Sequence, residues 1–361
     1  MSKKTMNRRV FTTGVVAAAA AVPAFGLATR FAPGAAAQDP IVATMVTDTA
    51  GLGDQNFNDL ANAGGTKAAT DFGVEFKVIE STDATAYLPN LTAGAEQGQL
   101  TIGVGFLLTD AITEVATDNP DKSFLLIDSV SEAPNVESVT FKEQQGAFLA
   151  GIAAGLMTKT NKVGAVGGQK IPPVVHYLVG FEAGVKCVNA ECEVAIGYAD
   201  TFDDPALGKE LALAQYNNGA DISMPAAGRT GIGGFEAAKE KGAGFWVIAA
   251  DTDQDHLAPG FQLGYVKKGV DTTVYKTIGE VVNGAFMPGA QNLGLEAENG
   301  ISFEDPYGIV TPEVWAVINT YKAAVIDGTI VVPEDEDQLA AFTPVTLDAL
   351  PAASPVASPA A

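Results

Sequence analysis

Short apolar runs alternate with longer segments of helical periodicity along most of the chain. Near-continuous apolar strands that alternate with helices of about 10–15 residues are typical of βαβ units, whose parallel sheets are covered by helices on both faces. The chain is therefore predicted to be an α/β protein. Predicted strands occupy 41–46, 76–80, 100–105, 123–128, 136–141, 162–167, 193–198, 220–225 and 245–250. Predicted helices lie near 54–72, 87–97, 110–118, 143–158, 173–185, 205–217, 230–241 and 269–284.

The spacing of these elements predicts two sheets, one from 41 to about 140 and one from about 141 to 250. The length also exceeds that of one typical core and favours two domains. In the simplest arrangement the remaining chain returns to the first lobe and then to the second, which gives three crossovers. The predicted lobes are 38–140 with 255–286, and 141–254 with 287–345.

The two ends of the chain are predicted to lie outside these lobes. Residues 1–37 combine basic residues, a weakly apolar Ala/Val run and small residues before Gln38, which is typical of a cleaved secretory signal. Arg8 and Arg9, followed by Val10 and Phe11, favour a twin-arginine signal over an ordinary secretory one. The Pro/Ala/Ser-rich tail, 346–361, is predicted to be disordered.

Net charge and cysteine content limit the classes of partner and the kind of membrane attachment that this chain can have. The net charge is −22, and removal of 1–37, which holds five basic and no acidic residues, makes it −27. Such an acidic body is unsuited to nucleic acid and to anionic lipid. No cysteine stands at the cleavage site, so we expect an exported protein without a lipid anchor. Cys187 and Cys192 frame a short loop in which a disulfide is predicted; two free thiols are the alternative.

The loops after the predicted strands are where a ligand is expected, because parallel α/β sheets bind ligands outside the carboxyl ends of their strands. They supply Asp, Asn, Phe, Gly and Gln, but no nucleophile beside a base. No complete phosphate loop and no G-x-S-x-G motif occurs, and the two histidines lie far from any Cys-x-x-Cys pair. We therefore expect no catalysis, no cofactor and no metal.

Two of these loops repeat one pattern. DQNFND places Phe57 among amide and acid groups, and ADTFDD places Phe202 among acid groups in the other lobe. Two such rings are suited to holding a planar ring between them, and stacking of a base on an aromatic contributes roughly 1–3 kcal/mol. Asp251 begins the acidic run DTDQD, where helix capping is the alternative to recognition of a ligand hydroxyl or amine.

Six motifs occur in the order TDTAGLGDQNFND, GVGFLLTDA, FKEQQGAFLAGIAAG, AAGRTGIGG, DTDQD and KGVD. In this order they resemble the basic membrane protein family, the PnrA-like purine nucleoside receptors of ABC transporters, over about 41–285. The resemblance implies a type I periplasmic-binding-protein fold of two Rossmann-like lobes joined by three hinge crossovers, and no catalysis. It implies that Phe57 and Phe202 stack the purine, Asn58 hydrogen-bonds nearby, Asp110 meets the base edge, Asp251 and Lys268 hold ribose hydroxyls, and Gly228 lets the backbone approach.

The implied partners are a purine nucleoside and an ABC permease with a cytoplasmic ATPase, outside the cytoplasmic membrane. We expect a monomer. The family's lysine lies three residues before Asp in K-x-V-D, so the resemblance implies that Lys268 and not Lys267 is the ligand contact. Three alternatives remain: a sugar or signal-molecule receptor of the same fold, a binding protein that serves a membrane sensor, and a secreted enzyme built on an α/β lobe.

Overall fold

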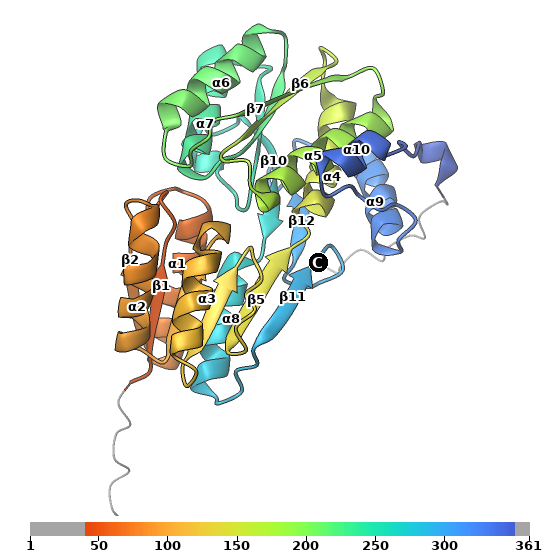
Figure 1. The fold of residues 1–361 in the computed structure, drawn as a ribbon. Coiled ribbons are helices and arrows are strands. Elements are labelled where there is room, and N and C mark those ends of the chain that lie inside the picture. Colours follow the sequence, from red (N-terminus) through yellow and green to blue (C-terminus); the bar gives the residue numbers. More distant parts are fainter. Residues whose placement is uncertain (1–39, 351–361) are drawn as a thin grey trace, which may run out of the picture. The chain divides into compact units, whose positions relative to one another are not determined.

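The computed structural model describes residues 40–350, which form two six-stranded sheets, each the centre of one lobe (Figure 1). The first sheet consists of β1 (Val42–Val46), β2 (Glu75–Ile79), β3 (Leu100–Val104), β4 (Ser123–Ile127), β5 (Val136–Phe141) and β11 (Gly289–Leu293). The second consists of β6 (Lys162–Gly167), β7 (Glu193–Tyr198), β8 (Ile222–Ala226), β9 (Trp246–Ala249), β10 (Gln262–Lys268) and β12 (Ile301–Glu304).

The two sheets repeat one topology. The strand order is β11-β5-β4-β3-β1-β2 in the first and β12-β10-β9-β8-β6-β7 in the second. All pairs are parallel except β10 with β12. Strands β3, β8 and β9 are buried along all or most of their length, as expected where helices cover both faces of a parallel sheet. The α/β prediction is confirmed.

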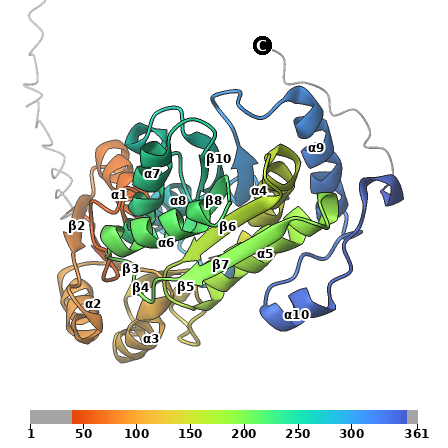
Figure 2. The ribbon, with the colours of Figure 1, turned by 90° about the horizontal axis from the view of Figure 1, so that it is seen from above.

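Ten helices accompany the strands in the described part of the chain. The first lobe carries α1 (Phe57–Phe72), α2 (Tyr87–Gln97), α3 (Thr109–Asp118) and α8 (Val270–Val282). The second carries α4 (Glu143–Met157), α5 (Pro172–Val188), α6 (Pro205–Asn217), α7 (Ile232–Lys241), α9 (Pro312–Ile326) and α10 (Glu336–Ala341) (Figure 2).

Helix α4 is the best buried helix of the second lobe, which its all-round Ala, Gly, Leu and Phe content predicts. It packs against α5 so closely that a Cβ on Gly151 would lie 2.1 Å from the carbonyl oxygen of Phe181. Only glycine permits that approach of two backbones. The start of α4, and with it Glu143, is thereby fixed in the second lobe directly after β5 of the first.

The chain passes between the lobes three times: between β5 and α4, between β10 and α8, and between β11 and β12. The predicted boundaries need correction, because β10 belongs to the second sheet and β11 to the first. Segment 255–286 is therefore divided between the lobes, and so is 287–345. The hydrophobic pattern could not show this, since β11 (GAQNL) is an exposed edge strand without apolar alternation.

The ends of the chain differ in part from expectation. The predicted disorder begins too early, because Leu347–Ala349 form a 3₁₀ turn and Leu350 is buried in the core of the second lobe. The predicted signal, 1–37, and the rest of the tail, 351–361, lie outside the described residues. Among the described helices, none combines the length and the apolar character that a membrane crossing requires.

Candidate ligand-binding site

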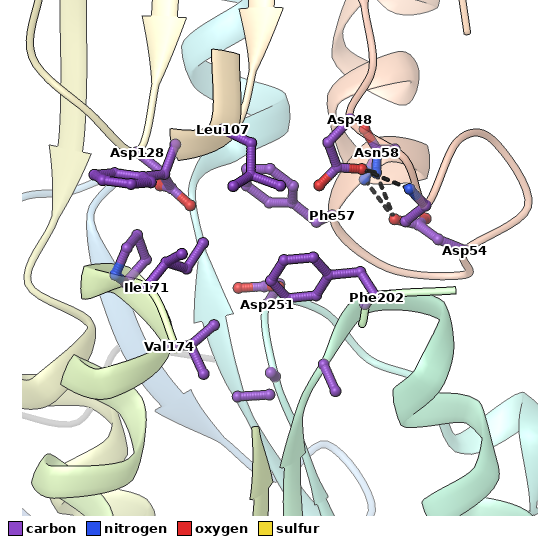
Figure 3. A pocket seen from close by; sticks show the side chains of 18 of the residues that line it. Asp48, Asp54, Phe57, Asn58, Leu107, Asp128, Ile171, Val174, Phe202 and Asp251 are labelled. Carbon is purple, nitrogen blue, oxygen red and sulfur yellow. Dashed lines mark hydrogen bonds between the residues drawn. The ribbon is translucent and has the colours of Figure 1, made fainter. Parts of the chain in front are cut away.

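A cavity of about 570 Å³, partly open to solvent, lies between the two lobes at the carboxyl ends of their strands (Figure 3). The first lobe contributes the loop after β1, the start of α1 and the residues after β3 and β4. The second contributes the start of α5 and the residues after β7, β8 and β9, and Lys268 closes the hinge side. Its mostly apolar walls, with a few polar side chains among them, are typical of a small-molecule site.

Two aromatic rings from different lobes line this cavity. Phe57 is the first residue of α1, and Phe202 stands in the loop after β7. Figure 3 shows the two rings approaching each other from the two lobes. Phe202 is held against Gly168, where a Cβ would lie 2.3 Å from its ring carbons. The predicted pair is thus brought to one cavity, with a ring contributed by each lobe.

One end of the cavity is a buried amide and carboxylate cluster. The Asn58 side-chain nitrogen donates to Asp48 at 2.8 Å and to Asp54 at 3.0 Å. Asp54 also accepts the backbone N–H groups of Asn56 and Asn58 in the turn before α1. Burial raises the pKa of Asp48 to about 6, against the hydrogen bond from Asn58. Asn58 Oδ1 is buried without a hydrogen-bond partner among the described residues.

The hinge end of the cavity is an ionic cluster. Lys268 Nζ lies 2.6 Å from Asp128 and 3.0 Å from Glu143, and all three side chains are buried. Glu143 also contacts His176 Nδ1 at 3.0 Å. Burial alone would lower the pKa of Lys268, but Asp128, Glu143 and Asp251 raise it, so the lysine stays charged. Burial raises the pKa of Asp128 despite this ion pair.

Asp251 completes the polar lining on the second lobe. Its Oδ1 accepts a hydrogen bond from the Tyr177 hydroxyl at 2.8 Å, and burial raises its pKa. Asp128 and Asp251 each follow a central strand, β4 and β9, and each has a left-handed backbone, with φ of 68° and 62°. Such strain in residues other than glycine gathers at functional sites, and here it occurs at equivalent positions of the two lobes.

A second set of contacts joins the lobes at the rim of the cavity, and we call these the rim contacts. An Arg229 Nη donates to the carbonyl of Leu52 at 2.7 Å, and the Gln254 amide donates to the carbonyl of Gln55 at 2.9 Å. His256 Nε2 lies 3.0 Å from Gln55 Oε1. The loop between β1 and α1 is thus bonded to the second lobe by groups outside the cavity lining.

Six of the seven predicted site residues line this one cavity: Phe57, Asn58, Phe202, Gly228, Asp251 and Lys268. Lys268 is 2% exposed, whereas Lys267 points away from the cavity and pairs with Glu304 at 3.6 Å. Gly228 has φ of 54°, and a Cβ there would touch Phe202 only at ordinary distances, so its backbone angle is what favours glycine.

Asp110 is the exception, because it does not line the cavity in which the base edge was expected to meet it. It lies in the first turn of α3, is exposed, and lines a different surface groove. Besides Asp251, the carboxylates in the cavity are Asp48, Asp54 and Asp128, which the sequence patterns did not single out. A signal was present for two of them, because Asp48 stands two positions after a predicted strand and Asp128 is the last residue of another. Tyr177 carries no such signal, since it lies inside a helix.

The remaining expectations concern cysteines and metals. Cys187 and Cys192 are free thiols and both are buried, so the predicted disulfide is wrong and its alternative holds. Burial raises the pKa of Cys187 to about 11. Within residues 40–350, no group of three or more His, Cys, Asp or Glu side chains is arranged to hold a metal ion.

Comparison with known proteins agrees with this geometry. The family model described as ABC transporter substrate-binding protein PnrA-like matches residues 41–336. The ABC transporter nucleoside-binding protein BmpA of Lactococcus lactis is 32% identical over 91% of this chain and 99% of its own. The CD4+ T-cell-stimulating antigen of Listeria monocytogenes is 34% identical over 80% of this chain and 87% of its own.

Solved structures show the same fold. An ABC transporter solute-binding protein from Aeropyrum pernix has a TM-score of 0.78 and 29% identity, and covers 84% of this chain and 96% of its own. One from Conexibacter woesei, at 22% identity, has a TM-score of 0.64 across 81% of this chain and 99% of its own. The two repeated sheets and the cleft between them therefore define a type I periplasmic-binding-protein fold.

Within that class, the chain belongs to the PnrA-like family of ABC transporter substrate-binding proteins. The family resemblance and the fold expected from the sequence are both confirmed. The family and the structural neighbours named above are described as proteins that bind solutes, not as enzymes. The chain is accordingly a substrate-binding protein of an ABC transporter.

Proposed function

We propose that this protein is the extracytoplasmic component of an ABC importer that binds a purine nucleoside of the guanosine, adenosine or inosine type. The observation that carries the proposal is the pair Phe57 and Phe202, one ring from each lobe, in a cavity with a polar cluster at either end. A purine is planar and a nucleoside is polar at both ends, so the two shapes correspond. The name of the Lactococcus lactis relative supports the ligand class.

In the proposed complex the base stacks between the two rings. Its hydrogen-bonding edge faces Asp48 and Asn58, whose Oδ1 is the free acceptor of that cluster. The ribose lies toward the hinge, where Asp251 accepts hydrogen bonds from its hydroxyls and Lys268 donates to them. Carboxylates accept hydrogen bonds from hydroxyls, and the buried Asp128 Oδ1, also without a partner among the described residues, adds an acceptor there.

The charge of the cavity supports a nucleoside over a nucleotide. Four aspartates line it against one lysine, and that lysine is already paired with Asp128 and Glu143. A phosphate group would be placed among carboxylates with no free cation, at the cost of desolvating its charges. An uncharged ribose meets no such penalty.

Delivery to a permease follows from closure of the two lobes around the ligand. Hinge closure around a ligand is the motion for which periplasmic binding proteins are known. A ligand favours the closed state only through contacts that the open state lacks, and a base held between Phe57 and Phe202 supplies such contacts from both lobes. We propose that the protein acts as an exported monomer, directed by the twin-arginine signal of residues 1–37.

Calorimetric titration of the purified mature protein tests the ligand. Adenosine, guanosine and inosine should bind, whereas arabinose, glucose and adenosine monophosphate should not. Small molecules released from freshly purified, denatured protein should include a purine nucleoside by mass spectrometry. Binding of a sugar with no binding of any nucleoside would instead establish the sugar-receptor alternative.

A further inference from the structure

A second cavity lies beside the candidate ligand-binding site, at the hinge, and we call it the hinge cavity. Its space, counted together with the open solvent at its mouth, is about 580 Å³. It is formed where β5 passes into α4, where α5 begins, and where the segment before α10 crosses them. The residues that carry its chemistry are Asp128, Glu143, Gln144, His176, Asn292 and Glu334.

The hinge cavity adjoins the proposed nucleoside pocket. Phe106, Asp128 and Pro173 line both. Asp128 also pairs with Lys268, so these shared walls stand at the end of the pocket where the ribose is proposed to lie. A substituent on the ribose that points away from the base is therefore directed toward the hinge cavity.

Hydrogen-bond acceptors dominate the hinge cavity. The Gln144 side-chain nitrogen donates a hydrogen bond to Glu334 at 2.8 Å. Gln144 is only 3% exposed, and its Oε1 has no hydrogen-bond partner among the described residues. Asp128 Oδ1 is likewise buried without a partner. A buried acceptor left without a donor costs free energy, so each of these two atoms points to a missing donor.

The charges facing the hinge cavity are also unbalanced. Asp128, Glu143 and Glu334 contribute three carboxylates, whereas the one buried ammonium among them belongs to Lys268. His176 contacts Glu143 and lines the cavity, and it offsets part of this charge only when protonated. Phe106, Phe141 and the two prolines give this cavity apolar walls. A cationic donor suits such a cavity, and an anion does not.

We propose that the hinge cavity is a subsite for a primary ammonium group carried at the 5′ end of a purine nucleoside. Its ammonium donates to Gln144 Oε1 and Asp128 Oδ1 and is attracted by Glu334. The ligands of this protein then include amino-substituted nucleosides as well as simple ones. This inference rests on the proposed function, because it takes the position of the ribose from it.

The test compares nucleosides that differ only at the 5′ position. Titration at neutral pH uses 5′-amino-5′-deoxyadenosine, adenosine and 5′-deoxyadenosine, together with the matching guanosine series. The amine should bind at least about tenfold more tightly than the deoxy compound, because its ammonium makes charge-assisted hydrogen bonds where the deoxy compound makes none. Gln144→Met and Glu334→Gln should each reduce this ratio at least about threefold.

Controls separate this inference from the proposed function. Glu96→Gln removes one exposed carboxylate on α2, far from either cavity, and should leave the amine-to-deoxy ratio unchanged. Glu334 is exposed, so its variant should fold even if Gln144→Met does not. If the parent nucleosides bind but the amine gains nothing, the hinge-cavity subsite is wrong and the proposed function stands. If no nucleoside of either series binds, both fail.

Discussion

The ammonium of Lys268 lies 2.6 Å from the carboxylate of Asp128, and this buried ion pair joins the last residue of β10 in the second lobe to the loop after β4 in the first. Glu143, at the crossover from β5 to α4, shares the same ammonium. One side chain thus serves two of the three passages between the lobes and also lines the ligand cavity. Lys268 thus combines a position in the hinge with a place in the cavity lining.

Lys268→Met should destabilise the protein strongly, because it leaves two buried carboxylates without their cation. Breaking a buried pair from one side costs about 3–5 kcal/mol. Lys267→Met is the matched control: Lys267 is more than half exposed in its side chain, and its contact with Glu304 should contribute less than about 1 kcal/mol. Urea unfolding gives the free energy of unfolding of both variants. Equal stability of the two variants would show that the buried cluster is not held by Lys268.

Phe57→Ala and Phe202→Ala should each weaken nucleoside binding by an order of magnitude or more. Each removes one face of the proposed stack, worth roughly 1–3 kcal/mol. Calorimetric titration with adenosine and guanosine checks this, with Phe245→Ala as control, since Phe245 packs against Tyr216 in the second lobe outside the cavity. Affinity that is unchanged in either pocket variant contradicts the proposed clamp.

The rim contacts should contribute to affinity although they touch no ligand. Gln55→Ala and Arg229→Ala remove hydrogen bonds that exist only while the lobes are together. One such bond contributes a net of about 0.5–1.5 kcal/mol, so we expect roughly two- to tenfold weaker binding and, by small-angle scattering, a larger open population. Lys209→Ala, which breaks ion pairs within the second lobe only, should change neither quantity.

Nucleoside affinity should depend on pH through Asp48. Burial raises the pKa of Asp48 to about 6, and a ligand donor needs the ionised carboxylate. Below that pH the free protein holds a proton on Asp48 that the ligand must displace, so the contribution of Asp48 should lower the affinity by up to about tenfold per pH unit under pH 6 and should be constant above it.

Asp48→Asn should remove the part of this dependence that belongs to Asp48, while a slope from Asp128, whose pKa is also raised, remains. Titration series of both proteins from acid to neutral pH give the comparison. Tighter binding in acid would mean that a protonated Asp48 donates to the ligand.

The two thiols should behave as separate, protected groups. Cys187 and Cys192 are buried, and burial raises the pKa of both, so few thiolates form at neutral pH. Alkylation followed by mass spectrometry should label neither rapidly in the native protein and both after denaturation without reductant. If the denatured protein is alkylated only after reductant is added, the disulfide between Cys187 and Cys192 exists after all.

Much of the fold was predictable because buried parallel strands leave a clear signal. The runs KVGAVG and EVAIGY coincide with β6 and β7, and VESVTF coincides with β5. The last two strands leave little signal, since β11 is an exposed edge and β12 has only four residues. Their membership in one sheet or the other depends on contacts between segments far apart in the chain, which local periodicity does not report.

The candidate site shows the same division. Phe57 and Phe202 were found because an aromatic residue in a polar loop is conspicuous, and Asp251 because it directly follows a strand. Asp110 stands just beyond a strand too, but the helix that begins at Thr109 turns it to the outside. Whether a carboxylate after a strand faces inward depends on the backbone of that turn, as the left-handed angle of Asp128 shows.

The passage of the chain between the lobes also governs how it is assembled during synthesis. Helix α8, which packs on α1, and strand β11, which pairs with β5, are made after the second-lobe segment from α4 to β10. Domains usually fold in the order in which they leave the ribosome. Here a nascent chain that ends at residue 141 would present an unpaired β5 edge and an uncovered α1. Completion of the amino-terminal lobe therefore waits for residue 293, and neither lobe can be excised from the gene as one continuous segment.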